Sequence, residues 1–329
     1  MNKTLMGASV VALSSAQVSV AQAAEWDLDW GGFIDTDFVY TSQDVTADDT
    51  DGFDVLTNAE IIFTPSITLD NGLTFGARIE FEADNDGNGG TVSGNTDEAW
   101  AFVKGSFGEI RAGAEDSPFG TMTTGAPSYK AGVTSGTFTG TYLDEGLRFA
   151  GNADSISGDA QKVIYYTPRF SGFQVGVSYA HGVSSDDRDI EEEQNVLSFG
   201  ANYSQDFGAA SVSLSGTYET ADDADDRFSL GASVGFSGVT IGGGYAQVDD
   251  QYDFFNLGVG YETGPWGVAL SGSYSDFDDG DEVTKGTLNG KYDLGPGVSA
   301  RAFVAYGELD SDAGDNDGFA IGTGINLSF

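Results

Sequence analysis

Carboxylates dominate the chemistry-bearing residues of this chain of 329 residues. It contains 52 Asp and Glu against 13 Lys and Arg, a formal charge of −39. Acidic runs offer the oxygen ligands that hard cations such as Ca²⁺ and Mg²⁺ prefer. The candidate ligands are Asp186, Asp187, Asp189, Asp222, Asp223, Asp310, Asp312 and Asp315. No run matches the twelve-residue calcium loop, so bound calcium and a solvated acidic surface both remain open interpretations.

Other kinds of chemistry find little support in the residue types. The chain has no cysteine, and His181 is its only histidine. Ser184 lies three residues later in a predicted loop, so the two do not form a nucleophile and base on one face. Twelve basic residues after Lys3 are too few to build a cationic patch within this negative field. We therefore expect no enzyme activity, no nucleic-acid partner and no cofactor apart from the calcium considered above.

Residues 1–23 differ in composition from the rest of the chain. Lys3 precedes a stretch of apolar and small residues over 5–20, and Ala21-Gln22-Ala23 follows, while no acidic residue occurs before Glu25. This pattern is typical of a cleaved export signal, although a short N-terminal helix of the mature fold is the alternative. We expect cleavage after Ala23, which leaves residues 24–329 as one domain.

The mature part of the chain alternates apolar and small residues with a period of two. Residues 319–329 place Phe, Ile, Thr, Ile, Leu and Phe on one face and Ala, Gly, Gly, Asn and Ser on the other. Residues 210–220 and 266–275 repeat this pattern, which is that of a β-strand. A soluble sandwich would expose a face that is unusually poor in Lys and Glu. In a membrane barrel, bulky residues meet lipid and small polar residues meet water.

The connections between these strands are of two alternating kinds. Tight, nearly neutral turns such as 70–72 and 237–238 alternate with longer acidic connections such as 221–226 and 308–317. The count of turns predicts an all-β fold, a transmembrane antiparallel β-barrel of about sixteen strands. One segment, 115–160, has no clean alternation and is far longer than an ordinary loop, so we expect it to be functional.

Several motifs carry a family resemblance once this architecture is in view. They are residues 63–66 (FTPS), 70–76 (DNGLTFG), 105–113 (GSFGEIRAG), 117–120 (SPFG), 165–173 (YYTPRFSGF) and the terminal Phe329. In this order they make the chain similar to the general diffusion porins of Gram-negative bacteria, of the α-proteobacterial, Rhodobacter-like type. The resemblance covers nearly all of residues 24–329.

The resemblance implies an architecture and a set of partners. Such porins are sixteen-stranded outer-membrane barrels, usually homotrimers, in contact with lipid and lipopolysaccharide. Their third loop, here within 115–160, folds into the lumen and narrows it. Small hydrophilic solutes and ions pass by diffusion. The terminal Phe329 resembles the signal that the barrel assembly machinery recognises.

The predicted pore lining consists of charged residues on inward strand faces and on the long segment. On the wall these are Asp35, Glu60, Arg78, Glu80 and Arg111; on the segment they are Asp116, Lys130, Asp144, Glu145 and Arg148. The resemblance implies basic residues on the first strands, where this chain has Asp35 and Glu60. Fixed charges in a narrow aqueous pore select ions of the opposite sign. We therefore predict a preference for cations.

Three alternatives to a cation-preferring diffusion channel stay open. The carboxylates can pair with Arg78, Arg111, Lys130 or Arg148, which leaves weak selectivity. The chain can be a substrate-preferring porin, or a structural or adhesive barrel that does not conduct. The inward faces are rich in Gly, Ser, Ala and Thr, which favours an open pore because a plugged interior needs larger packing residues.

Overall fold

The computed structural model describes most of the mature chain. The described residues are 25–44, 51–85, 95–134, 143, 150–152, 154–183 and 195–329. The predicted export signal 1–23 therefore lies outside them. So do the predicted pore residues Asp144, Glu145 and Arg148, and the candidate calcium ligands Asp186, Asp187 and Asp189.

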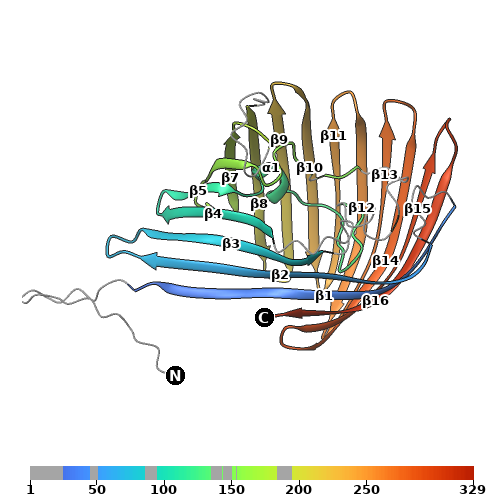
Figure 1. The fold of residues 1–329 in the computed structure, drawn as a ribbon, viewed down its shortest axis with the longest axis horizontal. Helices are drawn as coiled ribbons and strands as arrows, with labels where there is room; N and C mark the ends of the chain where they lie inside the picture. The colour runs from blue at the N-terminus through green and yellow to red at the C-terminus, as the bar shows by residue number, and fades with distance from the viewer. Residues whose placement is uncertain are drawn as a thin grey trace, which may run out of the picture.

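Sixteen antiparallel strands form a closed barrel, which confirms the predicted architecture. Each strand pairs with its neighbours in sequence, and β1 closes the barrel by pairing with both β2 and β16. The strands are β1 (Asp27–Gln43), β2 (Gly52–Thr68), β3 (Thr74–Asn85), β4 (Asn95–Gly105), β5 (Gly108–Ala114), β6 (Gln161–Tyr166), β7 (Phe173–Ala180), β8 (Val196–Phe207), β9 (Ala210–Ala221), β10 (Ala224–Phe236), β11 (Val239–Val248), β12 (Tyr252–Thr263), β13 (Trp266–Phe277), β14 (Glu282–Gly295), β15 (Val298–Asp310) and β16 (Asn316–Ser328). A four-residue helix, α1 (Pro118–Thr121), lies beside β7 and β8 (Figure 1).

The outward faces of the strands carry the bulky apolar residues. On β12, Leu257 is 67% exposed and Phe255 48%, whereas Phe254 and Asn256 on the inward face are buried. Closure of the sheet lets neighbouring strands satisfy one another's backbone groups, as a lipid environment requires. Within the described residues, no helix is both long and apolar enough to cross a membrane.

The tight turns lie where the sequence predicts them. At the turn between β10 and β11, Ser237 and Gly238 both have positive φ angles, 51° and 85°, as a two-residue hairpin turn of type I′ requires. A Cβ on Gly238 would lie 2.4 Å from the backbone oxygen of Glu262, so glycine is required there.

The acidic connection predicted over 221–226 is shorter than expected. Strand β9 continues to Ala221 and β10 begins at Ala224, so two residues form the turn. Aspartate is unfavourable within most strands, which is why the sequence suggested a loop. At the rim of a barrel its side chain can reach water while the backbone keeps its pairing.

The inward faces are less uniformly small and polar than the sequence predicted. An apolar cluster on one side of the lumen includes Phe254, Phe277 and Phe303, which are at most 5% exposed. These side chains pack against Ala131 and Val133 of the long segment. The inward faces therefore hold large apolar side chains as well as the small residues that the sequence predicted. Part of the lumen is a packed core, because described residues of the segment such as Ala131 and Val133 pack into it.

Candidate functional site

The long segment between β5 and β6 runs along the inner wall of the barrel. Its backbone donates hydrogen bonds to inward-facing side chains of three separate strands. The bonds are Phe119 N to Ser198 Oγ (2.9 Å), Ala126 N to Asn256 Oδ1 (2.8 Å) and Tyr129 N to Asn289 Oδ1 (2.8 Å). The described part of the segment therefore lies against the wall from β8 to β14.

Glycines on the inner wall make room for the segment. A Cβ on Gly231 of β10 would lie 1.9 Å from the backbone oxygen of Thr124, and one on Gly242 of β11 would lie 2.6 Å from that of Gly125. Any larger residue there would collide with the backbone of the segment. The sequence shows these glycines but not which segment they face, so this role was missed.

A cavity of about 440 Å³ lies along the wall formed by β2 to β5. Its lining residues are Thr64, Arg78, Glu80, Glu98, Trp100, Phe102, Lys104, Glu109, Arg111 and Glu115. Three of these, Arg78, Glu80 and Arg111, are predicted pore residues. Trp100 and Glu98 share the inward face of β4, and their alternation with outward residues could have identified them from the sequence.

The two arginines of this wall are neutralised by neighbouring carboxylates. Arg78 is paired with Glu80. Arg111 lies 2.7 Å from both Glu109 and Glu115, and its guanidinium group lies 4.3 Å from the ring centre of Trp100. Such a stacked, doubly paired arginine has a fixed orientation and little net charge to offer a passing ion.

Asp35 is also paired rather than free. The Nζ atom of Lys130, on the long segment, lies 2.6 Å from Asp35 and 2.7 Å from Asp37. Arg301 of β15 lies 3.2 Å from the same Asp35 carboxylate. The alternative of local pairing therefore describes Asp35, Arg78, Arg111 and Lys130 in the structure.

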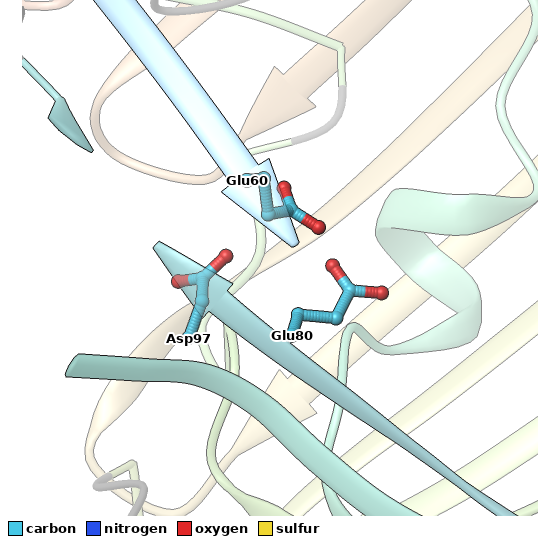
Figure 2. A group of neighbouring side chains, drawn as sticks. All are labelled: Glu60, Glu80 and Asp97. Atoms are coloured by element: carbon cyan, nitrogen blue, oxygen red, sulfur yellow. The ribbon is translucent and has the colours of Figure 1, made fainter. Parts of the chain in front are cut away.

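Two groups of three carboxylates remain on this side of the lumen. Glu60, Glu80 and Asp97 come from β2, β3 and β4, and Figure 2 shows their carboxyl groups turned toward one another. The second group is Glu98, Asp116 and Asp159. In each group, one oxygen from each of the three carboxylates lies within 4.8 Å of the other two.

Irregular pairing helps to explain the first group. The register shifts between Ala59 and Glu60 on β2, and again between Ile79 and Phe81 on β3. A bulge of this kind redirects side chains and is common beside functional sites. Asp97 was missed from the sequence because such a shift breaks the strict alternation on which the assignment of faces rests.

Burial shifts the protonation of the carboxyl groups on the segment. It raises the pKa of Glu115 to about 7, although Arg111 opposes the shift. It raises the pKa of Asp159 to about 6, and the negative charges of Asp116 and Asp97 add to this. Burial also raises the pKa of Asp116, against the effect of Lys162. These groups therefore change charge at a higher pH than free carboxyl groups do.

The candidate calcium ligands lie elsewhere. Within the described part of the chain, the groups of three carboxylates close enough to share a cation are the two described above. They include none of Asp222, Asp223, Asp310, Asp312 and Asp315. Calcium at the acidic connections therefore stays a prediction.

Comparisons with known proteins agree with the architecture. A family model described as Gram-negative porin matches residues 7–314. No curated protein sequence matches the chain. An anion-selective porin from Comamonas acidovorans has a TM-score of 0.64 at 17% identity, over 93% of this chain and 100% of its own. A porin refined at 1.8 Å resolution has a TM-score of 0.64 at 20% identity, over 92% of this chain and 100% of its own. A mutant porin of Rh. blastica has a TM-score of 0.63 at 18% identity, also over 92% of this chain and 100% of its own.

The structural likenesses, all at low identity, show a shared fold. The family match covers most of the chain, and the closed barrel of sixteen strands agrees with it. The chain belongs to the Gram-negative porin family.

Proposed function

We propose that this porin is a passive channel that prefers cations among the ions and small hydrophilic solutes it admits. A Gram-negative porin with a closed barrel is a multi-pass protein of the outer membrane and a diffusion channel. The preference for cations is the part that goes beyond family and fold. It rests on the charges that line the cavity along β2 to β5 and on the two carboxylate groups beside it.

Carboxylates outnumber basic residues along this wall and on the long segment. Among the described residues that line the cavity or belong to the two carboxylate groups, eight carboxylates stand against three basic residues. The carboxylates are Glu60, Glu80, Asp97, Glu98, Glu109, Glu115, Asp116 and Asp159; the basic residues are Arg78, Lys104 and Arg111. Low-dielectric walls focus the field of such a surplus into the water between them. Cations are attracted and anions repelled.

The zero-current potential of the refolded protein in a planar bilayer tests this proposal. Under a gradient of a simple salt we expect the sign that cation flow produces, with cations at least about threefold more permeant than anions. The same structural fold occurs in a porin named as anion-selective, so the sign is a real test. An anion-dominated potential would overturn the preference, and absence of channels from folded protein would favour a structural or adhesive barrel.

The pH dependence of selectivity gives a second test. Asp159 and Glu115, with pKa values raised to about 6 and about 7, lose their negative charge as the pH falls through this range. We expect the cation preference to weaken by about twofold or more between about pH 8 and pH 5, a range in which free carboxyl groups stay ionised. Constant selectivity over this range would contradict the assigned role of the segment.

The assembly of the channel is a further part of the proposal. We propose a homotrimer in contact with lipid and lipopolysaccharide, with Phe329 as the signal for the assembly machinery. The backbone of Phe329 exchanges hydrogen bonds of 3.0 and 3.1 Å with Gly32, and its ring lies edge-on to Trp30. The last residue therefore contributes to the closure between β1 and β16.

A further inference from the structure

Two buried residues of opposite charge lie where the long segment leaves and rejoins the barrel. Lys162 on β6 is 4% exposed, and Glu219 on β9 is fully buried. Neither belongs to the wall that lines the cavity of β2 to β5. Burying a charge is costly unless hydrogen bonds compensate it, so their partners indicate what they do.

Glu219 accepts hydrogen bonds from both ends of the segment. Ser117, near its beginning, donates through Oγ at 3.0 Å. Near its end, Ser155 Oγ donates at 2.9 Å, the Ile156 backbone N–H at 2.5 Å and Ser157 Oγ at 3.1 Å. A carboxylate offers about four acceptor positions. Here the segment itself supplies four donors.

Lys162 makes the complementary set of bonds to backbone carbonyl groups. Its Nζ atom donates to the carbonyl oxygens of Glu115 and Gly158, and lies 3.5 Å from that of Ser157. An ammonium group has three donors and no acceptor, so these carbonyls match its capacity. Again one partner lies at the beginning of the segment and the others at its end.

We propose that Lys162 and Glu219 form a clasp that fixes the two ends of the long segment where they join the barrel. The clasp thereby holds the carboxylates of the segment in the passage, the water-filled part of the lumen beside β2 to β5. Each charge joins positions about forty residues apart in the sequence, 115–117 and 155–158. Ser198 extends the clasp: its Oγ donates to Ser117 Oγ at 3.3 Å and accepts from the Phe119 N–H at 2.9 Å, so α1 is tied to β8.

The two clasp residues do not line the passage themselves, but they position carboxylates that do. Asp116 and Asp159 of the second carboxylate group lie directly beside the fastened residues 115, 117 and 158. Loss of the clasp therefore moves these carboxylates relative to Glu98 on β4. The inference rests on the proposed channel function for its electrical consequences, but the fastening itself is independent of conduction.

Hydrogen exchange tests whether the clasp fastens the segment, separately from whether the protein conducts. In the folded protein in detergent, we expect Lys162→Met and Glu219→Leu each to speed amide exchange in 117–122 and 154–160 by about tenfold or more, because strong charge-assisted bonds are lost. Exchange in the distant strands β11 to β14 should stay unchanged. Lys104→Met on β4 removes a charge of the same sign two strands away, beside the turn between β4 and β5, and should leave both segments protected.

Milder variants guard against a failure to fold. Ser155→Ala and Ser157→Ala remove donors but no buried charge, and we expect a smaller increase of about threefold in exchange of the same residues. Glu219→Gln keeps one carbonyl acceptor and should recover part of the protection that Glu219→Leu loses. Wild-type exchange rates in all five clasp variants would overturn the proposal.

Single-channel recording completes the test. With the clasp broken, current through open channels should fluctuate between several levels where wild type shows one, at both signs of voltage. If wild type forms no channels, the proposed function fails while the exchange result still decides the clasp. If exchange rises but the current stays as steady as in wild type, the base is fastened without positioning the passage, and the proposal is overturned in that part.

Discussion

Replacing Glu60, Asp97 and Glu98 by their amides is expected to lower the cation-to-anion permeability ratio by about threefold or more. A unit charge roughly 8 Å from a passing ion contributes about 2 kcal/mol at an effective dielectric constant of 20, before screening by salt. None of the three forms an ion pair among the described residues, so no basic partner neutralises them. Neighbouring carboxyl groups disfavour one another's ionisation. The zero-current potential is therefore measured at low ionic strength and alkaline pH, where all three are charged.

A matched control separates the local field from the total charge. Asp27→Asn, Asp70→Asn and Asp206→Asn remove the same three charges near the tight turns, away from the carboxylate groups. This control should keep nearly the wild-type ratio. If the control and the triple amide variant change selectivity equally, the wall of β2 to β4 has no special role. Selectivity would then follow the overall charge.

Substitution of Gly231 by valine is expected to have the largest effect on the shape of the passage. The added Cβ would lie 1.9 Å from the backbone oxygen of Thr124, and neither the wall strand nor the segment can absorb that overlap with a side-chain rotation. The segment must move away from β10, and we expect the free energy of unfolding to fall by about 2 kcal/mol or more. Single-channel conductance should become heterogeneous, and the thermal midpoint of the barrel should fall.

Gly286→Val provides the comparison for this change. No atom lies within 4 Å of a Cβ built on Gly286, which is also in the middle of a strand. We expect this variant to conduct and melt like wild type. If both valine variants behave alike, the contact between β10 and the segment does not determine where the segment lies.

The barrel was predictable because its signals are local. An alternation of bulky and small residues over ten positions, as in 319–329, specifies which face of a strand meets lipid, without knowledge of any other strand. Tight turns such as Ser237-Gly238 mark the strand ends through their backbone conformation. The number of strands then follows by counting.

The interior was only partly predictable because its contacts join distant positions. Asp35 was recognised as inward-facing, yet its partner Lys130 lies 95 residues away. Glu219 alternates like any other inward residue, and nothing near it in sequence reveals that Ser117, 102 residues earlier, is its donor. Asp97 lies beside a register shift, which local alternation does not reveal.

The apolar cluster inside the lumen also spans the seam where the barrel closes. Val39 of β1 and Ala320 of β16 belong to it together with Ala131 and Val133. A barrel that closed around an empty lumen would leave this apolar surface in water, at a cost of about 25 cal/mol for each Å². Entry of the segment and zipping of the first strand to the last therefore bury the same surface. We therefore expect the two steps to occur as one cooperative event during folding.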